Sequence, residues 1–480
     1  MRHAVILSDL HLWQGTSSPD LWMRYRHRDF FPDAEVARLV GDLCARLEPG
    51  TAEFVFDGDV FDFDVAPVVN GTVRELAPPR DAVESAARMA AILDDHPRFL
   101  DALALALADG HEVVFIAGNH DVQLCFPAVR DVLADRIVAA HARHAALGPS
   151  ARSPRDRIVF RQWFHRTRND VHVEHGNQYD RYCSVRYPLE PLQRDARTIQ
   201  PTMGSLVMRH LISKMGYFNP NVDSTFLLTT RQYVHHWARY YLFSRRSLAM
   251  TWLFGSMRVA WELMTANECA DSRRADRNLR RAVDETGSDP DSLAWHTALF
   301  ALPSLRQASA LLQLDRVLVA SIVVLAAIAA RFAPVVALAL ASWAALLALA
   351  VRAKPVDRGL DDVYDGIGDA AVRIASIHDA RGVVFGHTHV AHESWVDGRF
   401  IGNCGTWAPM FSDVECRTPV ERGRPFVWLW GDREVLHGGL MRWVEDRIEA
   451  ARADGPDVPN GPLVPIPAVP VTRPSPTREL

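Results

Sequence analysis

The chain has 480 residues, which is enough for one large core with insertions or for two domains. Hydrophobic residues make up 48% of it, so most of the chain is expected to fold, and its net charge of −5 is not the strongly basic balance typical of a nucleic-acid-binding domain. The six cysteines form no C-x-x-C pair, which indicates free thiols in a reducing compartment and leaves histidines and carboxylates as candidate metal ligands.

The first apolar run, Ala4–Leu7, is far too short for a signal peptide, and no small-residue cleavage site follows it. We therefore predict that this run is the first β-strand and that the bulk of the protein stays in the cytoplasm.

Five short runs rich in Val, Ile and Phe are predicted to be strands, and each ends in a polar cluster. Helical patterns over Asp81–Asp94 and Arg98–Ala108 separate the early runs, and this alternation favours an α/β layered core with functional groups at the carboxyl ends of strands. The runs and their clusters are Ala4–Leu7 before Ser-Asp-Leu-His, Glu53–Phe56 before Asp-Gly-Asp, Glu112–Ala117 before Gly-Asn-His-Asp, Val171–Glu174 before His-Gly-Asn, and Gly382–Phe385 before Gly-His-Thr-His.

About two hundred residues separate the fourth cluster from the fifth, which is too many for a loop. An aromatic and Arg-rich stretch comes first, with helical spacing over Tyr233–Trp252 that suits either the headgroup level of a membrane or an ordinary amphipathic helix. The predicted organisation is 1–180 for the first part of the core, 181–314 for a helical lid insertion, 315–353 for a transmembrane helical hairpin, 354–450 for the second part of the core, and 451–480 for a disordered Pro-rich tail.

The hairpin is predicted from two apolar segments, Val317–Ala330 and Val335–Val351, that meet around Arg331 and Pro334. Both halves of the core must fold together, so the apolar region crosses a membrane twice or not at all. Positive residues at both ends, such as Arg316 and Arg352, favour a cytoplasmic catalytic side. The alternative is a helical hairpin buried in a soluble lid.

The residues in the clusters point to a site for two divalent cations. Asp9/His11 and His387/His389 are alternate residues, so each pair can direct both side chains into one pocket. Asp59 suits a bridging position because its two oxygens can serve both ions. Mixed His, carboxylate and amide ligation favours Mn²⁺, with Fe or Zn²⁺ as alternatives, over Ca²⁺. The predicted metal ligands are Asp9, His11, Asp59, Asn119, His175, His387 and His389.

Each cluster alone is also compatible with an ordinary turn or surface loop, so the argument depends on all five occurring in order. The order Asp9-x-His11, Gly58-Asp59-x-x-Asp62, Gly118-Asn119-His120-Asp121, His175 and Gly386-His387-x-His389 resembles the calcineurin-like metallophosphoesterase superfamily.

This resemblance implies two stacked mixed β-sheets flanked by helices, with a late strand and turn at Asn403–Trp407. It implies that Asp9, His11, Asp59 and His389 hold one metal ion, and that Asp59, Asn119, His175 and His387 hold the other. The implied reaction is phosphoester hydrolysis by a metal-bridging hydroxide. His120 would contact the phosphate or protonate the leaving oxygen, and Asp121 would hold its ring.

Other polar residues near the motifs carry weaker predictions. Asp62 is expected to be structural, and His172 and Asp180 are expected to support the ligands or to be irrelevant. The pair His235-His236 is expected on a helix surface.

The position of the lid loosely resembles the UDP-2,3-diacylglucosamine pyrophosphatase-like branch of the superfamily. That resemblance implies a lipid-linked or membrane-delivered phosphoester or pyrophosphate, a membrane lipid as partner and no nucleic acid. The chain departs from the branch in having His120 where an Arg is typical and in its longer insertion. The alternatives are a nuclease or cyclic-nucleotide phosphodiesterase on the same core, and a non-catalytic membrane-anchored scaffold.

Overall fold

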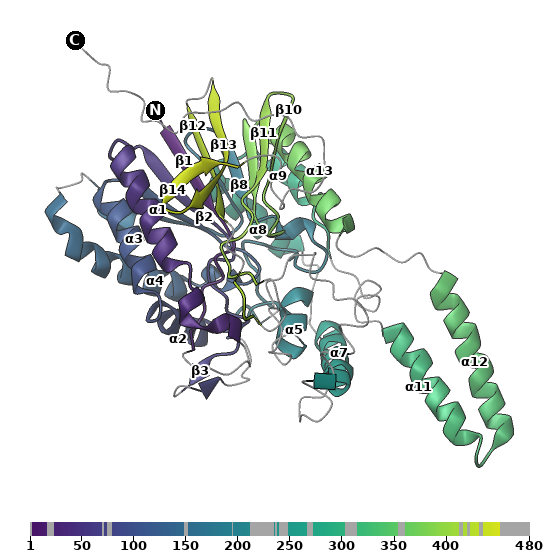
Figure 1. Ribbon diagram of the computed structural model, residues 1–480. Coiled ribbons are helices and arrows are strands. Elements are labelled where there is room, and N and C mark those ends of the chain that lie inside the picture. Colours follow the sequence, from purple (N-terminus) through teal and green to yellow (C-terminus); the bar gives the residue numbers. More distant parts are fainter. Residues whose placement is uncertain are drawn as a thin grey trace, which may run out of the picture.

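The computed structural model describes most of the core and parts of the insertion (Figure 1). The described residues are 2–16, 24–69, 72–73, 79–147, 152–193, 195–211, 235, 238–239, 248–265, 272–302, 314–353, 361–411, 416–419, 423–431 and 435–451. The predicted disordered tail and most of the aromatic stretch before Leu248 lie outside them.

The first sheet is mixed and contains the first three predicted strands. Its order is β14-β13-β12-β1-β2-β5-β6, with β1, β2, β5 and β6 parallel and the other neighbours antiparallel. Its strands are β1 (Arg2–Leu7), β2 (Ala52–Asp57), β5 (Glu112–Ile116), β6 (Ile158–Arg161), β12 (Arg424–Gly431), β13 (Leu436–Val444) and β14 (Arg447–Ala450).

The second sheet contains the other two predicted strands at its centre. Its order is β10-β11-β9-β8-β7, with parallel pairing of β11 to β9 and of β8 to β9. Its strands are β7 (Phe164–Arg166), β8 (Val171–Glu174), β9 (Gly382–Phe385), β10 (His392–Val396) and β11 (Arg399–Asn403). A separate small hairpin joins β3 (Val68–Val69) to β4 (Thr72–Val73).

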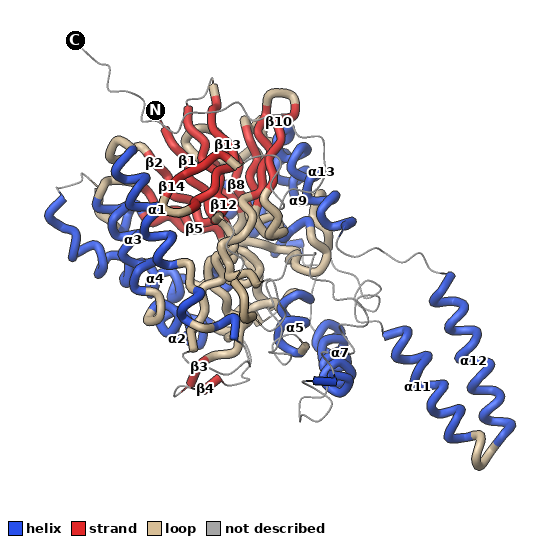
Figure 2. Tube along the Cα trace, viewed as in Figure 1, coloured by secondary structure: helices blue, strands red, loops and turns tan. Residues whose placement is uncertain are grey.

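The two sheets share an apolar core, and helices cover their outer faces (Figure 2). Side chains such as Ile6 and Val55 from the first sheet pack with Val173 and Val384 from the second. The first sheet's other face packs on α1 (Asp33–Arg46), α2 (Ala82–Leu93), α3 (Pro97–Ala108) and α4 (Pro127–His141). Helix α13 (Asp361–Ile377) covers the second sheet. The predicted α/β architecture of two mixed sheets flanked by helices is confirmed.

Local sequence explains where the early helices begin. Asp81 accepts hydrogen bonds from the backbone N–H groups of Val83 and Glu84, both at 2.9 Å, and so caps α2. Pro97 occupies the first turn of α3, where its missing N–H costs nothing. Both helices lie within one or two residues of their predicted bounds. Single-turn 3₁₀ helices occur at Arg24–Arg26, Arg28–Phe30, Val122–Cys125, Ala142–Leu147, Arg155–Arg157 and Asn177–Tyr179.

From Met203 onward the described part of the insertion is mainly helical, as predicted, whereas the described residues of 181–202 form turns and loops. Part of the insertion docks on the core. Leu293 packs with Trp163 and Phe164 at β7. Arg80, just before α2, forms an ion pair of 2.6 Å with Glu262. The helices are α5 (Met203–His210), α7 (Leu248–Thr265), α8 (Ser272–Thr286), α9 (Pro290–Thr297), α11 (Leu314–Ala329) and α12 (Pro334–Ala353).

Helices α11 and α12 form the predicted hairpin, which stands apart from the sheets in Figure 1. The prediction that it spans a membrane is not supported, because no helix among the described residues combines the length and the hydropathy that a crossing requires. Helix α11 has 16 residues, which at about 1.5 Å per residue cover roughly 24 Å, less than the roughly 30 Å apolar thickness of a bilayer.

We predict that Phe99→Ala destabilises the core by about 3–5 kcal/mol, because Phe99 is fully buried and its ring packs against Phe56 and Phe61. Urea unfolding followed by circular dichroism measures the change. The control is Val83→Ala on α2, where the side chain is 79% exposed and the expected change is within about 0.5 kcal/mol. Equal unfolding midpoints for the two variants would contradict this account of the core.

Candidate metal centre

The predicted ligands lie just beyond the ends of β1, β2, β5, β8 and β9. Asp9, His11 and Asp59 adopt positive φ angles of 54°, 46° and 49°, and His387 and His389 adopt 67° and 61°. Non-glycine residues rarely adopt this region, and such strain clusters at functional sites. The strained turns aim side chains from both sheets at one place.

Backbone and side-chain hydrogen bonds from a later loop hold Asp9 in this conformation. The carbonyl oxygen of Asp9 accepts hydrogen bonds from the backbone N–H groups of Trp407 and Ala408 and from the Thr406 hydroxyl, at 2.9–3.1 Å. The Asn403 amide donates to the Gly386 carbonyl at 2.6 Å. The predicted strand and turn at Asn403–Trp407 therefore fix the first ligand of the chain.

Asp9, His11 and His389 form the first group with metal-ligating geometry. His389 Nε2 lies 3.1 Å from Asp9 Oδ1 and 3.2 Å from His11 Nε2. Two ring nitrogens at that separation, beside a carboxylate oxygen without a hydrogen-bond partner, suit a shared cation.

Asp59, His175 and His387 form the second group. His175 Nε2 lies 3.0 Å from Asp59 Oδ2, and its Nδ1 donates to the carbonyl of Asp57 at 2.9 Å, which leaves Nε2 to act as the ligand atom. Asn119 lines the same pocket as His175, and its Oδ1 is buried without a partner. The structure thus brings six of the predicted ligands into these two groups and places Asn119 beside the second.

The charges of the centre favour a cation. Burial would raise the pKa of Asp9, but His175 and His389 outweigh it and hold that pKa well below its ordinary value. Burial likewise opposes protonation of His175, but Asp59 and Asp9 raise its pKa to about 10. The lowered pKa of Asp9 and the raised pKa of His175 both indicate that the centre stabilises positive charge.

His120 lies beside the two groups, but its partner is not the predicted one. Asp121 accepts hydrogen bonds from the backbone N–H groups of Gly118, Val60 and Phe61, at 2.6–3.3 Å, and so braces the loops instead of the His120 ring. His120 Nδ1 faces Asp64 Oδ2 at 3.2 Å and Asp62 Oδ1 at 3.5 Å. The prediction that Asp121 orients His120 is wrong, because the Asp121 carboxylate binds three backbone N–H groups and the His120 ring faces Asp62 and Asp64.

Three residues outside the predicted set contact it. Asp180 lies 3.0 Å from His387 Nε2, and Asp62 lies 3.3 Å from His11 Nδ1. The motifs in the sequence point to Asp62 and Asp180, but sequence reasoning misses Asp64. The alternation Phe-Asp-Phe-Asp over 61–64 was the available signal, because it places both carboxylates on one side of an extended segment. His235 is exposed on a helix, as predicted, and His236 lies outside the described residues.

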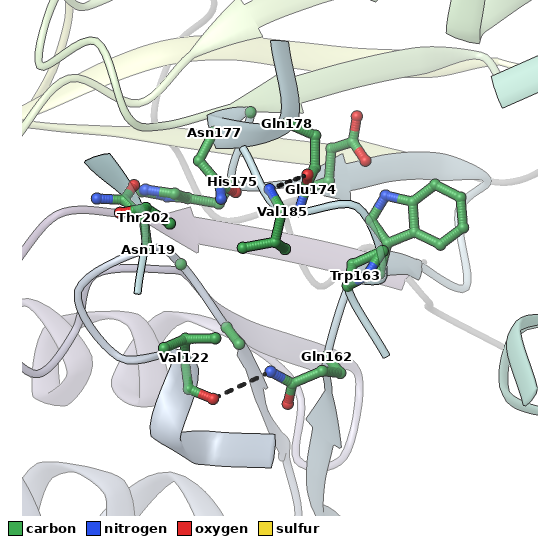
Figure 3. A pocket seen from close by; sticks show the side chains of 14 residues that line it. Asn119, Val122, Gln162, Trp163, Glu174, His175, Asn177, Gln178, Val185 and Thr202 are labelled. Carbon is green, nitrogen blue, oxygen red and sulfur yellow. Dashed lines mark hydrogen bonds between the residues drawn. The ribbon is translucent and has the colours of Figure 1, made fainter. Parts of the chain in front are cut away.

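A pocket opens beside the second group and extends away from it (Figure 3). Asn119 and His175 line one part of it, and Gln162 and Trp163 line another. Gln162 donates to the Val122 carbonyl at 3.3 Å, and Val185 N donates to Gln178 at 3.1 Å. The walls therefore come from both the core and the start of the insertion.

No protein-family model matches the chain, and no curated protein matches it significantly.

We predict that Gly386→Ala lowers the amount of bound metal, because an added Cβ would lie 1.8 Å from Ser8 Oγ and 2.6 Å from Asp9 Oδ2. Both groups are buried and would have to shift. Elemental analysis after dialysis against Mn²⁺ or Zn²⁺ measures the change. The matched control is Gly368→Ala in α13, where an added Cβ meets nothing within 4 Å. Unchanged metal content in Gly386→Ala would show that Asp9 is not a ligand.

Proposed function

We propose that the chain is a metallophosphoesterase of the calcineurin-like type that hydrolyses a phosphoester or pyrophosphate bond with two divalent metal ions. The observation that supports it best is the convergence of two cation-binding groups from five strand ends on one place, with His120 beside them. No other described cluster combines carboxylates, imidazoles and an amide in this way.

The donor set fits the proposed ions. Asp9 Oδ1, Asn119 Oδ1 and His175 Nε2 are buried without hydrogen-bond partners, which is costly unless another group binds them. Asp9, His11 and His389 would hold one ion and Asn119, His175 and His387 the other, with Asp59 between them. We propose Mn²⁺ first, with Fe or Zn²⁺ as alternatives. When bound, the ions would activate water and neutralise phosphate charge.

His120 is the chain's candidate proton donor. Its Nδ1 faces Asp62 and Asp64, so Nε2 is the nitrogen available to a substrate oxygen. The ring lies edge-on to His11 at a centroid distance of 5.0 Å, which places it next to the first metal group. Asp62 and Asp64 therefore take the orienting role.

We further propose that the substrate is lipid-linked or membrane-delivered and that the protein binds it at a membrane surface. The support is the hairpin, where Phe332, Val335 and Leu338 are 82%, 81% and 70% exposed. Exposed apolar side chains this close together mark an interaction surface. A lipid headgroup region would cover them without requiring a full crossing.

We predict that wild-type protein with Mn²⁺ hydrolyses bis-p-nitrophenyl phosphate and that Asp59→Asn reduces turnover to background, because both ions lose a ligand. His120→Asn should lower kcat by about 10²–10⁴-fold while metal content stays the same. His437→Asn, at an exposed position on β13, is the matched control and should behave like wild type. Metal-dependent turnover that survives Asp59→Asn would refute the proposed centre.

We predict that Leu338→Ser with Leu346→Ser weakens sedimentation with anionic phospholipid vesicles, because both side chains are at least 65% exposed on α12. Hydrolysis of the soluble diester should not change, since the hairpin stands apart from the metal centre (Figure 1). Val83→Ser on α2 is the control. If wild type and the hairpin variant sediment equally, the lipid-surface part of the proposal fails and the hydrolase part does not.

A further inference from the structure

A second group of metal-ligating side chains lies outside the centre described above. His172 and Glu174 on β8 meet His296 from α9, and their relative exposures are 0%, 1% and 0%. One nitrogen or oxygen atom from each lies within 4.8 Å of the others. Three buried polar side chains in such proximity need an explanation, because burial of polar groups is costly unless they are bound.

The alternation of side chains along β8 separates this group from the first centre. Val171 and Val173 face the core between the two sheets, and His175 continues on that side toward Asp59. His172 and Glu174 point to the opposite face, which the insertion covers. The two groups are therefore neighbours in sequence but lie on different faces of one strand.

Hydrogen bonds satisfy most of this group but not His172. Tyr179 donates its hydroxyl to Glu174 Oε1 and lies 2.7 Å from His296 Nε2. His296 Nδ1 lies 2.9 Å from His378 Nε2. Neither ring nitrogen of His172 has a hydrogen-bond partner, and Glu174 Oε2 also has none. A purely hydrogen-bonded network would leave a fully buried imidazole with an unused donor and an unused acceptor.

Two of the separations between polar atoms are near those of a tetrahedral cation site. Glu174 Oε2 lies 3.7 Å from His172 Nε2, and Glu174 Oε1 lies 3.4 Å from His296 Nε2. Ligands about 2.0–2.1 Å from a tetrahedral Zn²⁺ are roughly 3.3 Å from each other. Small rotations of the side chains would bring all three onto one ion.

The surroundings would fix the ligands in place. His378 can accept the Nδ1–H of His296, so that His296 Nε2 could ligate an ion in place of its contact with Tyr179. Phe164 stacks on His172 at a centroid distance of 4.5 Å, and Trp163 packs against His296 at 4.6 Å. Burial also lowers the pKa of His172 to about 4, so that its ring is neutral at physiological pH. A neutral imidazole is the form that binds a metal.

We propose that His172, Glu174 and His296 bind one further divalent transition-metal ion, with Zn²⁺ as the best fit. Two imidazoles and one carboxylate are ligands that Zn²⁺ takes in proteins. The ion would join β8 of the core to α9 of the insertion and so hold the insertion on the second sheet. This site does not depend on the proposed hydrolase activity.

The experiment counts metal ions in full-length protein. Wild type and a chain with both Asp9→Asn and Asp59→Asn, which disables the first centre, are dialysed against micromolar Zn²⁺ and then against metal-free buffer. We expect the double variant to retain one Zn²⁺ per chain and its zinc X-ray absorption spectrum to show imidazole and oxygen ligands. Adding His172→Gln or Glu174→Gln should remove that ion, and adding His392→Gln, at an exposed position on β10, should not.

A second readout reports on the insertion without using activity. Hydrogen–deuterium exchange over Pro290–Thr297 should speed up in the double variant when Zn²⁺ is removed and slow down when it is restored. In the chain that also carries Glu174→Gln, exchange there should not respond to Zn²⁺.

Two results would overturn the proposal. One is a folded double variant, with native circular dichroism, that holds no Zn²⁺. The other is Zn²⁺ retained in full after His172 and Glu174 are both replaced. If those replacements prevent folding, the double variant alone decides: one Zn²⁺ per chain with imidazole and oxygen ligands supports the site, and no bound Zn²⁺ refutes it.

Discussion

The candidate centre depends on how the two central strands of the first sheet end. β1 and β2 are parallel and in register with Leu7 opposite Phe56, so the segments that follow leave the sheet side by side. Their backbones stay paired beyond the strands, with hydrogen bonds from Asp9 N to the Gly58 carbonyl at 3.2 Å and from His11 N to the Asp59 carbonyl at 2.9 Å. Asp9 and Asp59 are therefore placed by the sheet itself, and the ligands from the second sheet have only to meet them.

This arrangement places several carboxylates in an apolar interior, where burial destabilises their charged forms. Asp57 is fully buried with no hydrogen-bond partner on either oxygen, and burial raises its pKa well above the ordinary value. Asp59 next to it stays ionised because His175 and His120 outweigh the effect of burial on its pKa. Buried carboxylates so close together are stable only with positive charge between them. A bound cation would supply such charge, in line with the two groups of metal-ligating side chains.

The sequence allowed the strands that carry the candidate ligands to be predicted, because each strand is an apolar run that ends in a polar cluster. Position after a strand is a local property, and Val171–Glu174 and Gly382–Phe385 match β8 and β9 residue for residue. The partner of His120 could not be predicted, because Asp121 is its neighbour in the chain whereas Asp64 lies far from it in sequence and only the fold brings that carboxylate to the ring. His296 lies more than a hundred residues from Glu174 in an unremarkable helix, and no local pattern links them.

The two faces of β8 connect these features mechanically. His175 directly follows Glu174, the last residue of the short buried strand β8, so we expect a movement of α9 that displaces Glu174 to displace His175 as well. Catalytic constellations work only within about 0.5 Å of their productive geometry. β8 pairs with β7 on one side and β9 on the other, and β9 leads directly to His387 and His389. The packing of the insertion on the second sheet is therefore coupled to the positions of three candidate ligands, His175, His387 and His389. This coupling is consistent with a long insertion between the fourth and fifth motifs that leaves the two motifs side by side.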